Sequence, residues 1–131
     1  MSTPQQILLD TSVIIDYEDV RGHLSGEAAI SAITFAELAA GVNRVDDPAE
    51  RIRRQMRLRW CEALDPIPFD IEAAHIYGSL AVLVEAMDRK PRKRVADLQI
   101  AATAVANNLP LYTRNPDDFK GLGAFLNVVA L

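Results

Sequence analysis

The sequence predicts an α/β fold, specifically a three-layer α/β/α sandwich around a central, mostly parallel sheet. Short apolar runs, such as residues 6–9 and 109–113, alternate along the chain with longer segments of helical periodicity. Strands and helices that alternate in this way form parallel sheets with helices on both faces. No internal repeat, low-complexity tract or linker divides the 131 residues, so we expect one domain over residues 1–131.

The first element is a short buried strand at residues 6–9, which is apolar and ends at a charged residue. Thr11 and Ser12 then offer capping hydroxyls for a short helix that reaches Tyr17. The sequence predicts a loop at residues 20–26.

The next strand and helix are predicted together. Residues 28–33 are too short and apolar to be assigned by periodicity alone. The pattern Thr34-x-x-Glu37 that follows is a capping box, which opens a helix over residues 35–42. The preceding apolar run is therefore expected to be a strand.

A basic helix is predicted to begin at Asp47 and Pro48, since proline is favoured in the first turn. Five arginines lie along it between Arg51 and Arg59. We expect its buried side to be the apolar stripe formed by Ile52, Met56, Cys61 and Leu64.

The second half of the chain continues the alternation. Asp70 caps a long helix over residues 71–87. The helix over residues 95–107 is rich in alanine and is expected to pack close against the sheet. The other predicted elements are an extended piece at residues 66–68, a charged loop at 88–94, a strand at 109–113, a helical turn at 116–119 and a strand at 126–129.

Composition narrows the possible settings of the protein. No run approaches the ~18 apolar residues of a membrane span, the start lacks the pattern of a secretory signal, and Cys61 is the single cysteine. We therefore expect a cytoplasmic protein with no membrane partner. The net charge is −4, yet 11 of the 14 basic residues lie in two clusters, Arg44–Arg59 and Arg89–Arg94. A segregated basic surface can bind phosphates despite a negative total.

Four carboxylates, far apart in sequence, lie where a strand or loop meets a predicted helix: Asp10, Glu37, Asp97 and Asp118. The carboxyl ends of parallel strands form one rim of the sheet, where ligands collect. Acidic groups gathered there repel one another unless a cation binds between them. A hard divalent cation, Mg²⁺ or Mn²⁺, is the natural partner of such oxygen ligands.

Each acidic residue also has an ordinary structural explanation. Asp10 can cap a helix, Glu37 can complete the capping box, and Asp97 suits the first turn of a helix because of the macrodipole. Their joint order favours a functional site. Nucleophilic or paired-histidine chemistry is not indicated, because His23 and His75 have no partner suggested by spacing and Cys61 is expected to be an apolar filler.

Four patterns in this order resemble the PIN-domain nuclease family, and most closely its VapC toxins. They are Leu8-Leu9-Asp10-Thr11-Ser12, Ser31-x-x-Thr34-x-x-Glu37-Leu38, Ala96-Asp97-x-x-Ile100-Ala101-Ala102-x-Ala104 and Thr113-x-Asn115-x-x-Asp118-Phe119. The resemblance implies a compact PIN-like domain with metal-dependent endoribonuclease activity on structured RNA, such as tRNA or rRNA loops. It also implies a homodimer and a toxin–antitoxin hetero-oligomer in which a cognate antitoxin inhibits the enzyme.

Carried over residue by residue, the resemblance makes Asp10, Glu37 and Asp97 the main metal-site carboxylates. Asp118 is the expected fourth acid. Asp117 competes with it. Asn115 stands where many PIN domains have aspartate and can still supply a neutral oxygen ligand or a hydrogen bond, and this departure leaves open whether one or two metals bind. The side chains expected to orient the acids and their waters are Thr11, Ser12 and Thr113.

The basic run before Asp97 has two interpretations. Charge runs are commonly solvated loops, but Arg92, Lys93 and Arg94 adjoin the acidic residues and are predicted to bind RNA phosphates, together with Arg114. Few aromatic residues are available for base stacking, so we expect recognition of backbone and shape with bases read in a single-stranded loop.

Three alternative functions remain open from the sequence. The first is a housekeeping RNA-processing nuclease of the same fold. The second is a non-catalytic signalling domain with an acidic Mg²⁺ pocket, such as a phospho-receiver, although Asp10 has no acidic neighbour and Thr113 stands where a lysine is expected. The third is a degenerate domain that only binds a partner.

Overall fold

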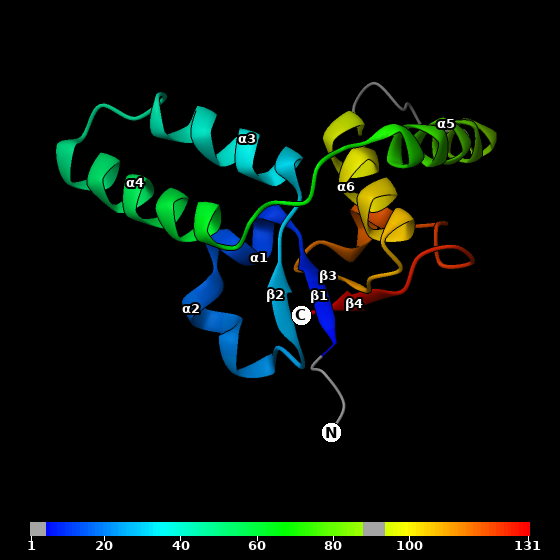
Figure 1. The fold of residues 1–131 in the computed structure, drawn as a ribbon, viewed down its shortest axis with the longest axis horizontal. Coiled ribbons are helices and arrows are strands. Elements are labelled where there is room, and N and C mark those ends of the chain that lie inside the picture. The colour runs from blue at the N-terminus through cyan, green and yellow to red at the C-terminus, as the bar shows by residue number, and fades with distance from the viewer. Residues whose placement is uncertain (1–4, 88–93) are drawn as a thin grey trace.

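The computed structural model describes residues 5–87 and 94–131 and contains a four-stranded sheet in the order β2-β1-β3-β4. All neighbouring strands are parallel, as the sequence predicts. β1 and β3 are the two inner strands of the sheet, and β2 and β4 form its edges (Figure 1). The strands are β1 (Gln6–Leu9), β2 (Glu27–Ala29), β3 (Leu111–Thr113) and β4 (Val128–Ala130).

Helices flank both faces of this sheet, which confirms the predicted architecture (Figure 1). α1 and α2 cover one face, and α5 and α6 cover the other. α3 and α4 form a hairpin that projects beyond the sheet. The helices are α1 (Thr11–Ile15), α2 (Tyr17–Val20), α3 (Ala32–Val42), α4 (Pro48–Ala63), α5 (Ile71–Ala86) and α6 (Val95–Ala106), with 3₁₀ turns at Arg21–His23 and Pro116–Phe119.

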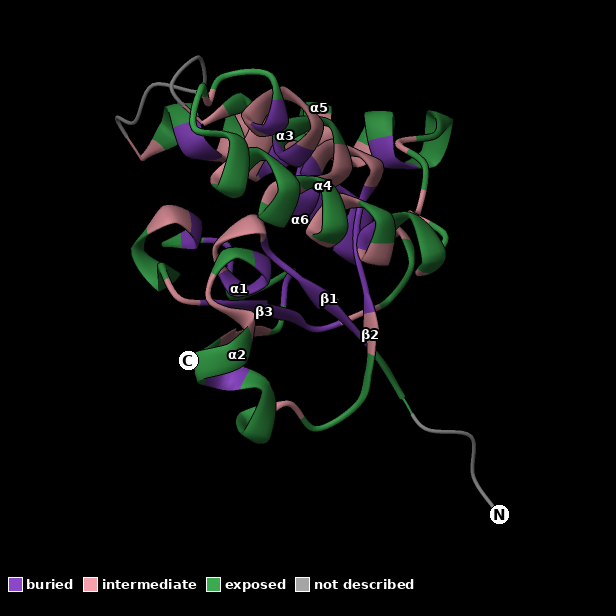
Figure 2. Ribbon diagram, turned by 90° about the vertical axis from the view of Figure 1, so that its left-hand side faces the viewer, coloured by how far each residue is buried: buried purple, intermediate pink, exposed green. Residues whose placement is uncertain are grey.

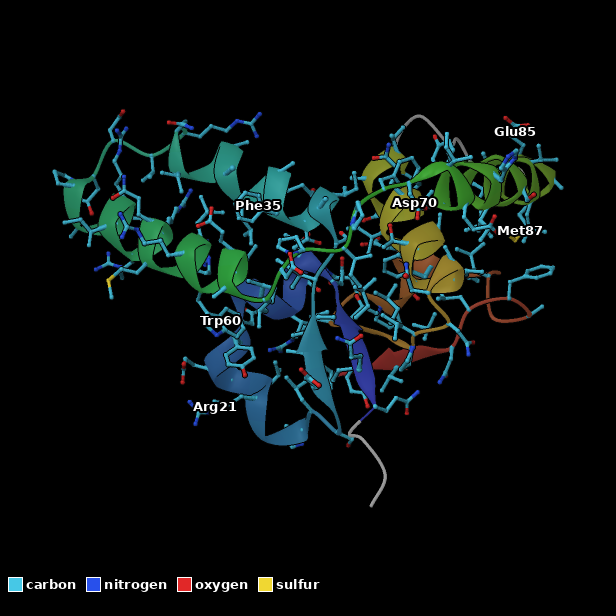
Figure 3. All side chains as sticks on the ribbon, viewed as in Figure 1. Arg21, Phe35, Trp60, Asp70, Glu85 and Met87 are labelled. Carbon is cyan, nitrogen blue, oxygen red and sulfur yellow. The ribbon has the colours of Figure 1, made fainter. Side chains whose placement is uncertain are left out.

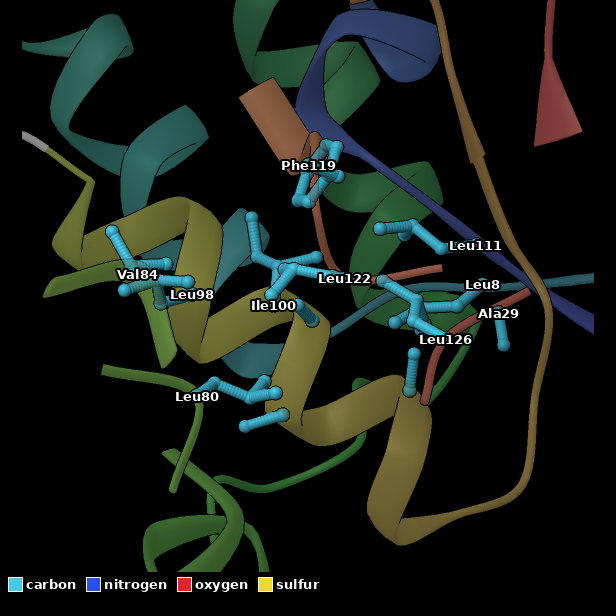
Figure 4. Close-up of a cluster of buried hydrophobic side chains, with 13 residues drawn as sticks. Leu8, Ala29, Leu80, Val84, Leu98, Ile100, Leu111, Phe119, Leu122 and Leu126 are labelled. Atoms are coloured by element: carbon cyan, nitrogen blue, oxygen red, sulfur yellow. The ribbon is translucent and has the colours of Figure 1, made fainter. Parts of the chain in front are cut away.

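Alternation along β1 divides the core into two clusters. Leu8 packs with the α5 and α6 side, in the cluster that Figure 4 shows. Ile7 and Leu9 point the other way and pack with α1. All three are buried, so the central strand is covered on both faces (Figure 2). Each fully buried aliphatic side chain of this kind contributes roughly 1.5–3 kcal/mol to stability.

The alanine-rich helix α6 packs against the sheet as predicted. Ala101, Ala102 and Ala104 have no exposed surface. They belong to the same buried cluster as Leu8 of β1 and Leu111 of β3, so α6 covers this face of the sheet. None of the described helices is long and apolar enough to span a membrane.

The capping box predicted at Thr34 and Glu37 is wrong. α3 begins at Ala32, and its N-cap is Ser31, whose Oγ accepts a hydrogen bond from the Thr34 amide at 3.0 Å. Ser31 also bridges to Ile67 in the extended piece at residues 66–68, which fixes the start of the helix. Glu37 therefore lies in the second turn of α3, and its carboxylate is free of the capping role.

The apolar stripe predicted on α4 is confirmed only at its C-terminal end, where Cys61 is buried and Leu64 packs against the same cluster. Ile52 is 56% exposed and Met56 is 67% exposed, whereas Cys61 is buried. The reason is that the α3–α4 hairpin extends past the sheet, so that along α4 only the last turns reach the core (Figure 1). Burial raises the pKa of the Cys61 thiol to about 11, which agrees with a packing role.

Candidate functional site

The candidate site lies at the carboxyl edge of the sheet, between β1 and β3. Asp10 follows β1, and Thr113 ends β3. Connections from these adjacent parallel strands lead in opposite directions, because the chain passes from β1 to β2 on one side and from β3 to β4 on the other. Such a switch point leaves a crevice at the strand ends, which is where open α/β sheets bind ligands.

Asp10 is held rigidly at this switch point and is only 4% exposed. Its Oδ1 accepts from the Thr11 amide at 2.9 Å, as the N-cap of α1. Its Oδ2 accepts from the hydroxyls of Ser12 at 2.9 Å and Thr113 at 2.8 Å. Three donors from two strand ends therefore fix both oxygens of one buried carboxylate.

The two hydroxyls that hold Asp10 are themselves held by the loop after β3. Ser12 Oγ accepts from the Arg114 amide at 3.2 Å, and Thr113 Oγ1 accepts from the Asn115 amide at 3.0 Å. These bonds orient each hydroxyl so that its hydrogen points at Asp10. The backbone of Arg114 and Asn115 thus supports the site, although their side chains do not contact Asp10 in these bonds.

Glu37 reaches the same edge from α3. The Thr11 hydroxyl donates to Glu37 Oε1 at 2.7 Å. The same Thr11 oxygen lies 3.1 Å from the buried hydroxyl oxygen of Thr34. Thr11 therefore connects the α1 capping turn to the second turn of α3. Thr34 is a member of this hydroxyl chain that sequence analysis assigned to capping.

Asp97 and Asp118 form the other half of the site, with Arg94 between them. Asp97 lies in the first turn of α6, and Asp118 lies in the 3₁₀ turn after β3. Arg94 Nη1 lies 2.5 Å from Asp118 Oδ1 and 3.9 Å from Asp97 Oδ2. All three side chains are about one-third exposed, at 32%, 33% and 28% for Arg94, Asp118 and Asp97.

Electrostatic coupling joins the two halves. The pKa of Asp97 is raised to about 6, first by burial and then by the charges of the neighbouring carboxylates Asp118, Asp10 and Glu37, while Arg94 lowers it. The four acids that the sequence singles out therefore share one electric field. Among the described residues, however, no three Asp, Glu, His or Cys side chains converge closely enough to make a finished ligand set.

The other predicted site residues fall in different places. The side chains of Asp117 and Asn115 are exposed, whereas Asp118 turns toward Arg94 and Asp97. Arg114 lies 3.6 Å from Asp16, an ion pair that sequence analysis missed. Arg92 and Lys93 lie outside the described residues. The sequence does contain an indication that Arg94 faces the acids, namely its i, i+3 spacing from Asp97.

A groove runs from the acidic site along α1. A cavity of about 620 Å³ between α1, α3 and α4 is lined by Thr11, Ile15, Glu37 and Arg57, among others. A second cavity, of about 860 Å³, is also lined by Ile15 and Arg57 and continues past Trp60. Figure 3 shows Trp60 where α4 meets α2, and its ring lies 4.7 Å from that of Tyr17.

Comparison with known proteins yields consistent matches. The PIN-domain family model matches residues 7–124. Ribonuclease VapC5 of Mycobacterium tuberculosis is 32% identical over 131 residues, covering 97% of this chain and 95% of that protein. Ribonuclease VapC of Rickettsia bellii is 33% identical over 126 residues, covering 87% of this chain and 88% of that protein. The crystal structure of VapBC-5 from M. tuberculosis, a member of the VapBC family of toxin–antitoxin systems, contains a chain that matches with a TM-score of 0.81 and 30% identity over 98% of both chains.

Proposed function

The chain belongs to the PIN-domain family as a VapC-type ribonuclease of the toxin–antitoxin class, and on this premise we propose that it cleaves structured RNA with Mg²⁺ or Mn²⁺ held by Asp10, Glu37, Asp97 and Asp118. The observation that carries the proposal is the placement of the acids at one edge of the sheet, where Asp10 is buried at the end of β1 and Asp97 and Asp118 flank Arg94. The raised pKa of Asp97 agrees with their proximity. The alternatives of a housekeeping nuclease or a non-catalytic domain lack comparable support.

The donor set fits a hard divalent cation. All four groups offer carboxylate oxygens, which Mg²⁺ and Mn²⁺ prefer, and no soft ligand is among them. Their mutual repulsion makes an added positive charge favourable, since it lowers the pKa of Asp97 toward its ordinary value. A cation bound there would acidify a water ligand and neutralise charge on the scissile phosphate.

The residues of the chain divide the remaining work. Asp10, fixed by Thr113 and Ser12, presents its carboxylate in one orientation without rearrangement. Thr11 holds Glu37 by its Oε1 and leaves the other carboxylate oxygen for a ligand or water. Orientation prepared in advance of the reaction reduces the reorganisation that phosphodiester cleavage requires.

Substitution of single acids tests the cation site. Asp10→Asn and Asp97→Asn each remove one charge at constant volume, so we expect RNA cleavage to fall by at least about a hundredfold. Cleavage of tRNA and rRNA is followed with Mg²⁺ or Mn²⁺, and circular dichroism checks folding. Asp19→Asn on α2 is the matched control and should cleave like the wild type. Near-normal cleavage by folded Asp10→Asn would contradict the proposal.

We propose that Arg92, Lys93, Arg94 and Arg114 contact the RNA backbone. Replacing Arg92 and Lys93 with alanine removes two charges next to the acidic site, and each phosphate contact contributes about 0.7–0.9 to the salt dependence of binding. The slope of log affinity against log salt should therefore fall by about 1–2. An unchanged slope would show that these two residues do not contact phosphates.

A cognate antitoxin is the proposed protein partner, since the VapBC-5 structure is that of a toxin–antitoxin system. We propose that it covers the groove along α1, where Ile15 is 55% exposed and Met56 67% exposed, and that it inserts an arginine among the carboxylates. Such a partner and excess Mg²⁺ would antagonise each other.

A charge in this groove tests the antitoxin surface. Met56→Asp places a carboxylate on the exposed part of α4, away from the four acids, so RNA cleavage should persist while antitoxin binding weakens. Growth of cells that co-express the toxin variant and the protein encoded beside it measures neutralisation. Gln55→Asp, on an exposed neighbouring position, is the control. Full neutralisation of Met56→Asp would exclude this part of the groove.

We also propose that residues 1–131 form one such domain, that it works in the cytoplasm, and that it forms a homodimer. The support for self-association is an apolar cavity of about 510 Å³ on α5, lined by Ile76, Val82 and Leu83 and bordered by Phe125. Val82 is 63% exposed there. Sedimentation of Val82→Lys should give a monomer if a second copy covers this surface.

A further inference from the structure

The side chain of Arg94 lies within the acidic site, although Arg94 belongs to a basic run in the sequence. It is the one member of the basic run Arg89–Arg94 that the structure describes, and it directs its guanidinium at Asp118 and Asp97. The distances are 2.5 Å and 3.9 Å. Both partners are carboxylates proposed to hold the divalent cation. The guanidinium therefore provides positive charge where that cation would also provide it.

The side chain of Arg94 can leave this position while its backbone stays. Arg94 is the N-cap residue of α6, and its carbonyl accepts the first helical hydrogen bond from the Leu98 amide at 2.8 Å. Its side chain takes no part in capping the helix. Because the guanidinium and both carboxylates are about one-third exposed, water can compete for each of them.

The contrast with Asp10 indicates which contact is replaceable. Asp10 is held by an amide and two hydroxyls, which are neutral donors that remain compatible with a bound cation. Asp118 is held by the full positive charge of Arg94, which repels a bound cation. A divalent cation near Asp118 and Arg94 would meet unfavourable electrostatic energy until the guanidinium moved.

We infer that Arg94 is an exchangeable counter-ion, which neutralises Asp118 and Asp97 in the metal-free protein and is displaced toward an RNA phosphate when a divalent cation takes its place. The inference rests on the proposed cation site. It adds that Arg94 leaves the two carboxylates when the cation takes its place. The guanidinium is a good ligand for phosphate oxygens because it donates two parallel hydrogen bonds, but it cannot serve Asp118 and a phosphate equally at once.

The first experiment measures the Mn²⁺ dissociation constant by calorimetry on the whole chain without RNA. Arg94→Gln removes the competing charge and should bind Mn²⁺ about tenfold more tightly than the wild type, allowing for solvent screening at a half-buried pair. Arg21→Gln is the matched control. It changes net charge equally, but its partner is the exposed Glu18 and it lies on the far side of α2 from the acidic site (Figure 3).

A double-variant cycle shows whether Asp118 carries the competition. Asp118→Asn weakens Mn²⁺ binding by itself, and in that background the additional Arg94→Gln change should tighten binding much less than in the wild type. A full effect of Arg94→Gln in both backgrounds would show that the arginine acts by long-range charge and would overturn the exchange with Asp118.

The second experiment measures RNA cleavage at saturating Mn²⁺. Arg94→Gln should cleave at least about tenfold more slowly than Arg21→Gln despite its tighter Mn²⁺ binding, because a contact to phosphate is lost. Equal cleavage by these two variants would overturn the transfer to phosphate.

The outcomes separate this inference from the proposed function. If the wild type binds Mn²⁺ and requires Asp10 for cleavage, but Arg94→Gln binds Mn²⁺ no more tightly than Arg21→Gln, the exchange is overturned and the nuclease site stands. If neither the wild type nor any variant binds Mn²⁺, the cation site fails and the exchange fails with it.

Discussion

The two halves of the acidic site are held by different chemistry. Asp10 and Glu37 are oriented by hydroxyl and amide donors that come from the ends of β1 and β3 and from α1. Asp97 and Asp118 face a side-chain cation, Arg94. The first half is therefore prepared before any ligand arrives, whereas in the inferred exchange the second half releases Arg94 when a cation binds. Rigidity and adaptability are divided between strand ends and the start of α6.

The sharpest way to break this comparison is to neutralise one acid from each half and measure stability. In metal-free protein at pH 7, Asp10→Asn should lower the free energy of unfolding by about 1–3 kcal/mol, because it weakens three hydrogen bonds to a charged group. Asp97→Asn should raise it by about 1–3 kcal/mol, because the fold disfavours the charged form. Urea unfolding with a chelator measures both. Changes of the same sign would contradict the division.

The pH dependence of stability sharpens the second half. The pKa of Asp97 is raised from 3.8 to about 6, so between these pH values the folded protein binds a proton that the unfolded chain releases. The contribution of Asp97 to the free energy of unfolding should therefore decrease by up to about 3 kcal/mol as the pH rises from about 4 to about 6. The difference between wild type and Asp97→Asn isolates this contribution. A difference that is constant with pH would exclude it.

A smaller effect is expected when a donor to Asp10 is removed. Thr113→Val keeps the shape of a fully buried side chain but leaves Asp10 Oδ2 and the Asn115 amide each without one partner. We expect a loss of about 1–2 kcal/mol in the free energy of unfolding. Thr113→Ser, which keeps the hydroxyl, is the control and should recover Mn²⁺ binding even if it packs less well. Equal Mn²⁺ binding by Val and Ser variants would contradict the orienting role.

The smallest effect belongs to the exposed link between Thr11 and Glu37. Thr11→Val removes the donor to Glu37 Oε1 while the Thr11 amide still caps α1 through Asp10. Because Glu37 is exposed, water replaces the lost bond, and stability should change by less than about 1 kcal/mol. RNA cleavage should fall more than stability does. If stability fell by as much as in Thr113→Val, the link would be structural.

The strand-end acids could be predicted from the sequence because the rule is local. Asp10 ends an apolar run, and the carboxyl ends of parallel strands share an edge whatever the details of packing. The start of α3 could not be predicted in the same way. Ser31 and Thr34 both fit the cap pattern, and a bridge to Ile67, distant in sequence, decides between them.

Two further features depend on tertiary structure alone. Ile52 and Met56 are exposed because the α3–α4 hairpin projects beyond the sheet. The periodicity of apolar residues within α4 gives no information on where the hairpin projects. Arg94 pairs with Asp118 across 24 positions, a contact that the basic run around Arg94 does not indicate. Both features depend on where elements distant in sequence lie relative to one another, which local sequence patterns do not contain.

The hydrogen bond from Thr113 to Asp10 joins residues 103 positions apart. During synthesis on a ribosome, the central strand β1 emerges early, but the neighbour that completes its second edge is made near the end. A growing polypeptide therefore carries Asp10 without the hydroxyl that fixes it and without Asp118. If Thr113 and Asp118 are required as proposed, the capacity to cut RNA would arise only once translation has passed these late residues.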